Sequence, residues 1–382
     1  MVTDTSTRLL AGGRVVTPEG VRPDAWVHVA GGAIVAVTGT RPVTDAPVRD
    51  LQGAWLLPGF VDLHMHGGGG HDVTDSPEAM AQAVAFHHRH GTTATLVSLM
   101  TAPVDQLCEQ LAWAAELTGR GGTPAVLGAH LEGPFLSPER AGAQDPAHML
   151  TPHAEILDRL LDAAAGALRI MTIAPELAGA LPAIARLRED NVVAALGHSA
   201  ADYAEAVAAI ATGASHATHL FNAMPPLHHR EPGLVGAALE ADISCELIND
   251  GRHVHPAVLA IVARTLSRPV LVTDAIAAAG AGDGAFTLGG QPVRVTDGEA
   301  RLIATGSLAG STLTMGEALR RTVNDSGLTV EQASAAASAN PAHVLGLERT
   351  RGSIAPGRRA DMVVLDDDLD VTAVMAGGVW CD

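Results

Sequence analysis

Histidine, glutamate and aspartate occur in this 382-residue sequence at spacings that favour metal chemistry. His64 and His66 close the segment LPGFVDLHMH and are followed by four glycines. Residues i and i+2 of a β-strand point to the same side, so the two imidazoles can bind one metal ion. A His-x-His pair alone is a weak signal, but the glycines strengthen it because they let the backbone approach a site closely.

A carboxylate and two further histidines form a second set. Glu132 lies in the apolar segment AVLGAHLEGP, where an unpaired buried carboxylate is costly and needs a metal or an arginine as its partner. With His198 and His219 it offers two nitrogens and one oxygen and leaves a position for water, as catalytic zinc sites do. We expect His130 to be either a ligand neighbour or a support behind the ligands, and His216 not to bind metal.

Asp274, in the segment PVLVTDA, is the candidate general base and is also counted among the metal ligands. A carboxylate beside a metal-activated water can accept its proton during attack on a carbonyl and return that proton to the leaving amine. An isolated TDA tripeptide carries little weight. Asp274 gains its weight by coming last in an ordered series of such residues, which together predict a metal-dependent hydrolase.

These residues lie at or just after the ends of segments that read as buried strands. Eight such segments occur, at residues 59–66, 93–99, 125–133, 168–176, 191–199, 214–222, 243–250 and 269–276. They alternate with alanine-rich helical patterns such as those at 76–91, 157–166, 202–213 and 255–266. This alternation is typical of parallel βαβ units, and eight of them close a (β/α)8 TIM-type barrel with its active site at the carboxyl ends of the strands. The predicted fold is therefore α/β, with the catalytic barrel at residues 57–344.

Both ends of the chain predict a small β-sandwich domain beside the barrel. Residues 1–56 and 345–382 contain short strand-like stretches separated by Gly-Gly pairs and other turn signals. The two ends can pair into one domain, because strands distant in the sequence often share a sheet.

The composition excludes several classes of function. A net charge of −18 argues against a nucleic-acid partner, which needs a positive surface, but a few local arginines and histidines can still hold one phosphate. The sequence contains no lysine, so Schiff-base and P-loop lysines are excluded. Any two-metal site must also be bridged by a carboxylate, since a carboxylated lysine cannot form.

Cysteine usage and hydropathy predict a cytoplasmic enzyme that does not contact membranes. The three cysteines are widely separated and lack the CxxC spacing of thiolate zinc sites. The first residues do not combine a basic region with an apolar stretch, and no apolar run is long enough to span a bilayer.

Several motifs, in order along nearly the whole chain, resemble those of the N-acetylglucosamine-6-phosphate deacetylase family of the amidohydrolase superfamily. They are PGFVDLHMHGGGG, GAHLEGPFLSP, LGHS, ATHLFNAMPPLHHREPG, INDGRHV, LVTDA, GSLAGSTLTM and GSIAPGRRADMVVLD. No motif is decisive alone, whereas HLEGPF, HLFNAM with REPG, and DGxHV in this order are jointly specific.

The resemblance implies hydrolysis of the acetamide of N-acetyl-D-glucosamine 6-phosphate to acetate and D-glucosamine 6-phosphate, in amino-sugar catabolism and cell-wall recycling. Glu132, His198 and His219 would hold the principal divalent metal, and His64 and His66 a second one that some members of the family lack. Zinc is the first candidate, with iron, manganese or cobalt as alternatives, because nitrogen and oxygen ligands suit all four.

The same resemblance implies the substrate contacts. Asn222 and Ala223 would face the phosphate, while Arg230 and His253 would supply charge from the neighbouring subunit of a homodimer. One departure is Gln144, which stands where the family usually has a histidine that polarises the substrate carbonyl. Glutamine can donate a hydrogen bond but cannot exchange a proton, so we expect Gln144 to orient the acetyl oxygen with less effect than a histidine.

Other interpretations remain open at this stage. Residues 306–311, GSLAGS, could be a flexible lid or a helix cap. The substrate could be a different N-acyl compound, such as an acylated amino acid, a cyclic ureide or another phosphorylated amino sugar. A barrel that binds metal without turnover is a third possibility, which the presence of Asp274 argues against.

Overall fold

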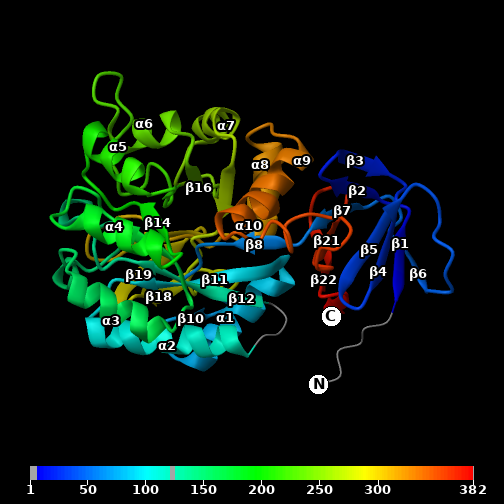
Figure 1. Ribbon diagram of the computed structural model, residues 1–382, viewed down its shortest axis with the longest axis horizontal. Coiled ribbons are helices and arrows are strands. Elements are labelled where there is room, and N and C mark those ends of the chain that lie inside the picture. Colours follow the sequence, from blue (N-terminus) through cyan, green and yellow to red (C-terminus); the bar gives the residue numbers. More distant parts are fainter. Residues whose placement is uncertain (1–6, 121–124, 382) are drawn as a thin grey trace.

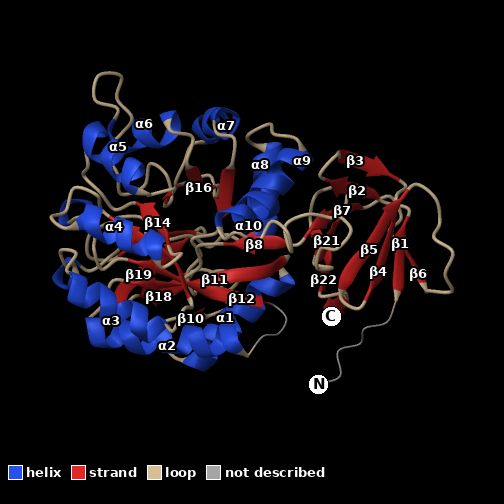
Figure 2. Cartoon of the chain, viewed as in Figure 1, coloured by secondary structure: helices blue, strands red, loops and turns tan. Residues whose placement is uncertain are grey.

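The computed structural model describes residues 7–120 and 125–381, which form two parts that lie side by side (Figure 1). The larger part is a barrel of strands with helices around it, and the smaller part consists of strands and loops (Figure 2). The first and last described strands both belong to the smaller part, so the chain leaves it, builds the barrel and returns.

The eight predicted barrel strands are all present, in chain order, in one parallel sheet. They are β8 (Phe60–Asp62), β11 (Thr92–Met100), β12 (Ala125–Glu132), β13 (Leu168–Ile173), β14 (Val193–Leu196), β15 (His216–Ala217), β16 (Ser244–Ile248) and β17 (Pro269–Val272). The segments that follow the two edge strands meet through a parallel bridge between Met65 and Ala275. The N–H of Asp274 also donates to the His64 carbonyl oxygen over 2.8 Å. The predicted (β/α)8 barrel is therefore confirmed, with every strand but β11 shorter than its predicted segment.

Apolar side chains fill the barrel below its mouth. Val61, Leu96, Ile170, Ile248 and Val270 belong to one buried cluster inside it. Burying each large aliphatic side chain contributes about 1.5–3 kcal/mol, and the filled interior confines polar chemistry to the carboxyl ends of the strands.

Helices cover the outside of the barrel, and several begin at residues suited to capping. Ser76 accepts a hydrogen bond from the Ala79 N–H at the start of α1, and Asp202 and Glu205 form a capping box on α5. The α-helices are α1 (Pro77–Arg89), α2 (Val104–Gly119), α3 (Ala154–Ala164), α4 (Ala180–Glu189), α5 (Tyr203–Thr212), α6 (Gly233–Glu240), α7 (Pro256–Thr265), α8 (Met315–Asn324), α9 (Val330–Ser334) and α10 (Asn340–Val344). Short 3₁₀ helices span Pro138–Arg140 and Pro146–His148, and a π-helical turn spans Ala335–Ala339.

The smaller part is a sandwich of two sheets built from both ends of the chain. One sheet has the order β5-β4-β1-β6 and the other β23-β22-β21-β7-β2-β3. Their bounds are β1 (Arg8–Ala11), β2 (Arg14–Thr17), β3 (Gly20–Pro23), β4 (Trp26–Ala30), β5 (Ala33–Thr38), β6 (Val48–Asp50), β7 (Trp55–Pro58), β21 (Met362–Leu365), β22 (Val371–Ala376) and β23 (Val379–Cys381). Leu10 and Val27 of the first sheet share a buried cluster with Leu56 and Met362 of the second. The predicted β-sandwich of the two chain ends is confirmed, while residues 1–6 and 382 of the predicted domain lie outside the described residues.

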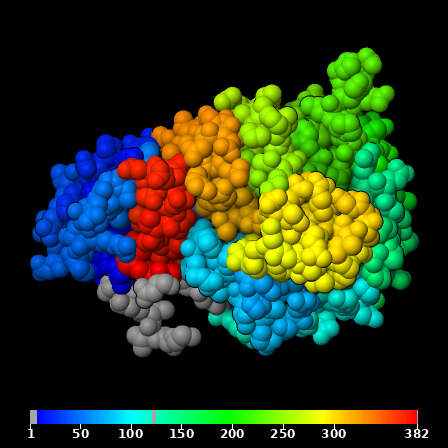
Figure 3. Space-filling model, turned by 180° about the vertical axis from the view of Figure 1, so that it is seen from behind, coloured from blue at the N-terminus to red at the C-terminus, as the bar shows by residue number. Residues whose placement is uncertain are grey.

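A further three-stranded antiparallel sheet follows the last barrel strand and is not among the predicted elements. It consists of β18 (Gly284–Leu288), β19 (Gln291–Thr296) and β20 (Glu299–Leu302). Its Leu288, Val293 and Val295 pack in one cluster with Met100 at the end of β11, so this sheet closes over the mouth of the barrel. Figure 3 shows it in yellow on the surface of the barrel, away from the blue and red strands of the chain ends.

A short hairpin lies directly after the His64 segment, where β9 (Gly67–Gly68) pairs with β10 (His71–Asp72).

Within residues 7–120 and 125–381, the structure contains no helix that is both long and apolar enough to cross a membrane.

Candidate metal centre

Two groups of three side chains at the barrel mouth could each hold a metal ion. One, the His64 cluster, consists of His64, His66 and Asp274; the other, the Glu132 cluster, consists of Glu132, His198 and His219. All six residues are buried, and in each cluster the three possible ligand atoms lie within 4.8 Å of one another. The structure therefore brings together every residue predicted as a metal ligand.

The Glu132 cluster gathers side chains from the ends of three barrel strands, β12, β14 and β15. Glu132 ends β12, and His198 and His219 follow β14 and β15 in turns with positive φ angles of 46° and 28°. The Glu132 Oε1 atom lies 3.0 Å from the Nε2 atom of each histidine, and the two Nε2 atoms are themselves 3.0 Å apart. Three polar atoms thus face one point at the floor of the mouth.

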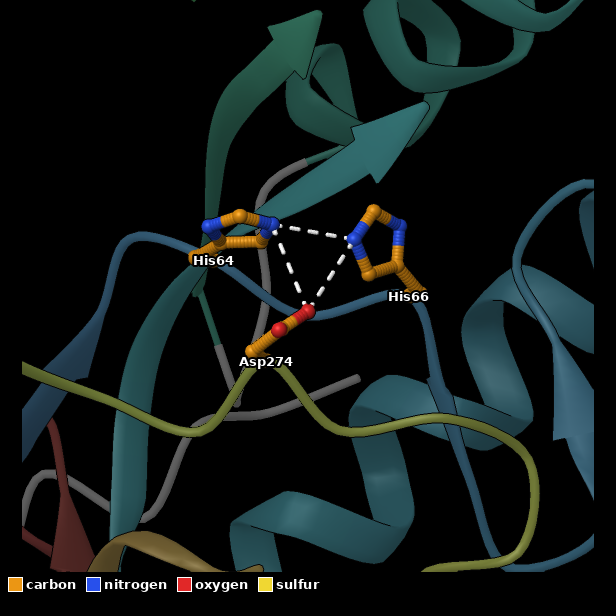
Figure 4. Close-up of side chains that lie close together, drawn as sticks. All are labelled: His64, His66 and Asp274. Carbon is orange, nitrogen blue, oxygen red and sulfur yellow. Dashed lines mark hydrogen bonds and ion pairs between the residues drawn. The ribbon is translucent and has the colours of Figure 1, made fainter. Parts of the chain in front are cut away.

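The His64 cluster combines one strand end with the turn at the opposite edge of the sheet. His64 and His66 follow β8, and their Nε2 atoms lie 2.9 Å apart. Asp274 follows β17, and its Oδ1 atom lies 3.5 Å from His64 Nε2 and 3.3 Å from His66 Nε2. Figure 4 shows the two rings and the carboxylate pointing toward one another. Barrel closure between β8 and β17 is what places Asp274 beside the histidines.

Glu132 contacts both clusters. Its Oε1 atom faces His198 and His219, while its Oε2 atom lies 3.3 Å from His66 Nε2. A carboxylate in this position can bind one metal through each oxygen. With no lysine in the chain, Glu132 is the residue whose geometry suits a bridging role.

The buried charges of the two clusters depend on one another. Burial alone would raise the pKa of Glu132, but the nearby imidazoles of His64 and His198 outweigh it and hold the pKa well below its usual value. Burial would lower the pKa of His66, but the Asp274 and Glu132 carboxylates accept hydrogen bonds from its protonated ring and raise the pKa to about 9. The mouth thus stabilises positive charge, which a divalent cation can supply in place of protons, and its nitrogen and oxygen donors are those that zinc and related metals bind.

Both clusters open into a cavity of about 290 Å³ at the carboxyl ends of the strands. Glu132, His66, His198, His219 and Asp274 line its floor. The remaining wall is formed by Met100, Gly142, Ala143, Gln144, Asn222, Ala223, His253, Leu288, Ser307, Leu308 and Gly310. The cavity therefore combines candidate ligands with hydrogen-bonding groups and an apolar side.

A family model described as the amidohydrolase family matches residues 55–381, which include the whole barrel and both ligand clusters. The chain belongs to this amidohydrolase family.

Individual amidohydrolases resemble the chain over nearly its whole length. The N-acetylgalactosamine-6-phosphate deacetylase of Escherichia coli O157:H7 is 40% identical, over 97% of this chain and 98% of that protein. The N-acetylglucosamine-6-phosphate deacetylase of Bacillus subtilis (strain 168) is 36% identical, over 95% and 94%. Among solved structures, a mutant N-acetyl-D-glucosamine-6-phosphate deacetylase from Mycobacterium smegmatis, in complex with N-acetyl-D-glucosamine-6-phosphate, is 42% identical with a TM-score of 0.93. That match covers 98% of this chain and 99% of the other.

Gln144 lies against one of the candidate metal ligands, Glu132. Its amide nitrogen donates to Glu132 Oε2 over 2.6 Å, and its Oε1 atom accepts from the Thr101 N–H over 2.8 Å. Both ends of the amide are thus engaged by the protein, and the nitrogen faces Glu132. The role of Gln144 toward an acetyl oxygen stays a prediction.

Of the five predicted substrate residues, Gln144 and three others reach the cavity and one does not. Asn222, Ala223 and His253 line it. His253 lines the cavity of its own chain, where its Nδ1 atom is paired with Asp250 Oδ2 at 2.7 Å. Its predicted reach into a neighbouring active site stays a prediction. Arg230 instead lies on a separate, exposed groove with Tyr203.

Two further histidines lie behind the ligands and outside both clusters. His130 is bonded to Ser98 Oγ at 3.0 Å and to Thr172 Oγ1 at 2.8 Å, and burial lowers its pKa to about 3, so it is neutral. His216 is bonded to Glu246. His130 therefore takes the supporting place rather than a ligand's, and His216 is not in either cluster.

Two buried acids at the site, Glu246 and Asp62, are not among the predicted site residues. Glu246 is fully buried in β16 and contacts His64 and His216. Asp62 accepts hydrogen bonds from Thr273 and from the His64 N–H, and burial outweighs these to raise its pKa to about 6. Both stand in apolar predicted strands, where a buried carboxylate needs a partner, so the sequence marks them by the same signal as Glu132.

Residues 306–311 do not form the helix cap that was one of the two expectations, and their role as a lid stays a prediction. Thr314 caps α8, so the helix cap lies beyond this segment. Ser307, Leu308 and Gly310 line the cavity. Ser311 is hydrogen-bonded to the segment that ends the last barrel strand. Its N–H donates to the Asp274 carbonyl oxygen over 2.7 Å, and its hydroxyl donates to the Thr273 carbonyl oxygen over 2.6 Å. The segment thus forms a wall of the cavity that also fixes the backbone of Asp274.

Proposed function

We propose that this amidohydrolase is a metal-dependent N-acetylglucosamine-6-phosphate deacetylase, which hydrolyses the acetamide to release acetate and D-glucosamine 6-phosphate. The observation that carries this proposal is the pair of ligand clusters joined by Glu132 at the floor of a cavity. The full-length resemblance to the M. smegmatis enzyme, whose structure holds N-acetyl-D-glucosamine-6-phosphate, supports the substrate.

The metal requirement follows from the donors. Glu132, His198 and His219 would hold one divalent ion and His64, His66 and Asp274 a second, with zinc as the first candidate and iron, manganese or cobalt as alternatives. When bound, such a metal polarises a carbonyl and lowers the pKa of water from about 15.7 to about 7.

Asp274 is the proton carrier of this proposal. It lines the cavity, and although burial alone would raise its pKa, His64 and His66 lower it, so the carboxylate is ionised at neutral pH. Asp274 accepts a proton from the attacking water as the oxygen bonds to the acetyl carbon. It then returns this proton to the amine as the C–N bond breaks, which leaves acetate and the amino sugar.

The phosphate end of the substrate is assigned to residues of the cavity wall. Asn222, Ala223 and His253 line this cavity within one chain. Arg230 does not, and we propose a homodimer in which Arg230 reaches the neighbouring active site, where its forked donors suit a phosphate. Gln144 is proposed to orient the acetyl oxygen from beside Glu132.

The proposal also includes a cellular compartment and a division into domains. The free cysteines Cys108, Cys245 and Cys381 suit a reducing cytoplasm. Residues 1–56 and 345–382 are proposed as one domain and residues 57–344 as the catalytic barrel domain.

The direct test is acetate release from N-acetyl-D-glucosamine 6-phosphate by the zinc-loaded enzyme, with Asp274→Asn beside it. Asparagine keeps the shape but cannot accept the proton, so kcat should fall by roughly 10²–10⁴-fold. N-acetyl-D-glucosamine without phosphate should be a much poorer substrate. Equal rates for the enzyme and Asp274→Asn would refute the proposed base, and equal rates for both sugars would refute the phosphate site.

A second candidate substrate is the 4-epimer. It is favoured by the resemblance to the E. coli protein named N-acetylgalactosamine-6-phosphate deacetylase. Measuring kcat/KM for both phosphorylated epimers under the same conditions decides which is preferred.

A further inference from the structure

Glu246 lies beneath both ligand clusters and faces neither solvent nor the cavity. It is on β16, its side chain is fully buried, and it does not line the cavity. A charged side chain at such a position is costly unless specific partners compensate it. Glu246 cannot contact substrate, so any role in the site must act through the residues to which it is hydrogen-bonded.

The partners of Glu246 belong to both clusters. Its Oε2 atom lies 2.9 Å from His64 Nδ1 and accepts the His219 N–H over 3.0 Å. Its Oε1 atom lies 3.1 Å from His216 Nε2, which fixes the remaining end of the carboxylate. The Glu246 carboxylate is therefore hydrogen-bonded to the ring of His64 in one cluster and to the backbone of His219 in the other.

These contacts act differently on the two clusters. An imidazole whose Nδ1–H donates to a carboxylate presents Nε2 as its metal ligand, and the carboxylate makes that nitrogen more basic. The His64 Nε2 atom is the one that faces His66 and Asp274. The His219 ring gains no such effect, because Glu246 holds only its backbone, and its Nδ1 atom has no hydrogen-bond partner among the described residues.

We propose that Glu246 is a positioning residue that sets the affinity of the His64 cluster for a second metal ion, with a smaller effect on the ion of the Glu132 cluster. This inference rests on the metal dependence in the proposed function. It adds which residue controls the second ion and through which atoms.

The first experiment is a titration of metal-free protein with zinc alone, followed by calorimetry and by metal analysis after dialysis. Glu246→Gln removes the charge with little change in shape, and we expect it to weaken zinc binding at the His64 cluster by roughly 10–100-fold. The ion of the Glu132 cluster should change much less. Glu116→Gln is the matched control, because it removes the same charge from an exposed pair with Arg120.

The variant His66→Gln identifies which ion is affected. It removes a ligand from the His64 cluster alone, so the ion that it loses should be the ion that Glu246→Gln weakens. Combining the two substitutions should add little to His66→Gln, since both act on one site. If Glu246→Gln bound both ions as tightly as the unmutated protein, or if the unmutated protein bound only one ion at saturating zinc, the proposal would be wrong.

A second measurement does not depend on how the variants fold. In the zinc-loaded unmutated protein labelled with ¹⁵N-histidine, NMR should show the proton of His64 on Nδ1 and the metal on Nε2. A proton on Nε2 would overturn the proposal. Neither experiment uses the sugar, so absence of deacetylation would count against the proposed substrate and leave the role of Glu246 intact.

Discussion

The His64 and Glu132 clusters lie side by side, but different parts of the structure hold their side chains in place. In the His64 cluster, both rings are fixed from behind: His64 Nδ1 faces Glu246, and His66 Nδ1 faces the Ser98 carbonyl oxygen at 3.1 Å. In the Glu132 cluster only His198 has such a partner, the Arg140 carbonyl oxygen at 2.9 Å, among the described residues.

Backbone turns take over part of this task in the Glu132 cluster. His198 and His219 both adopt positive φ angles, which are unusual for residues with a side chain and persist only where the surroundings enforce them. Outer hydrogen bonds thus hold both rings of the His64 cluster, and turns with positive φ hold both rings of the Glu132 cluster. Asp274 of the His64 cluster shares such a turn, with a φ of 48°. The comparison teaches that the two ions should respond to different substitutions, even though they share Glu132.

We expect the greatest effect from a substitution of Glu132, which contacts both clusters. Glu132→Gln takes a charged ligand from both clusters, so zinc should be lost from both and kcat should fall by about 10³-fold or more, since metal catalysis supplies several kcal/mol. His66→Gln should affect only its own cluster. Metal analysis and acetate release measure both, with Glu139→Gln, an exposed charge in the same loop, as the control. Retention of one full zinc by Glu132→Gln would show that the clusters do not share this ligand.

The next prediction concerns His87, which holds the backbone that follows His64 and His66. His87 is buried, its Nε2–H donates to the Gly67 carbonyl oxygen over 2.9 Å, and its Nδ1 atom has no partner among the described residues. Burial lowers its pKa from 6.5 to about 4. Above pH 6.5 the ring is neutral in both folded and unfolded chains and has no effect on the pH dependence. Between pH 6.5 and 4 only the unfolded chain takes up the proton, so folding stability falls as the pH falls, by roughly 3 kcal/mol in total.

His87→Gln keeps an N–H donor but does not titrate. The free energy of unfolding in urea, measured between pH 7 and pH 5 on metal-free protein, should therefore depend less on pH in this variant by roughly 2 kcal/mol. Parallel curves for the two proteins would mean that the folded protein also carries the proton on His87.

The last prediction concerns Gly142, which lies against His198 of the Glu132 cluster. Gly142 has a φ of +60°, and a Cβ atom there would come 3.1 Å from His198 Cε1. Gly31 has nearly the same φ, +58°, but a Cβ atom there would meet nothing within 4 Å. Alanine should cost roughly 1–2 kcal/mol of stability at either position because of the left-handed backbone.

Only Gly142→Ala should also displace His198, and we expect it to weaken zinc binding at the Glu132 cluster by about tenfold. Thermal unfolding reports the shared cost, and zinc titration reports the difference. Similar zinc affinities in Gly142→Ala and Gly31→Ala would indicate that the loop moves away instead of the ligand.

Most strands and helices could be predicted from the sequence, because buried parallel strands and amphipathic helices each have a local pattern of apolar residues. The sheet β18–β20 was not, since its short segments Gly284–Leu288 and Gln291–Thr296 lie among glycines and polar residues and gain their core only by packing on Met100. His253 shows the same limit: its residue type indicated a charge at the site, but its position in its own chain's cavity depends on how the loop after β16 folds back.

The sequence by itself determined the types of ligand, their order along the chain and their places at strand ends, because alternation and burial are local properties of a strand. Only the tertiary structure decided that Glu132 faces both clusters, that Asp274 joins His64 and His66, and that Glu246 supports them from beneath. Those contacts join residues from different strands that are far apart in the sequence, and closure of the sheet, which no local pattern encodes, sets the distances between them.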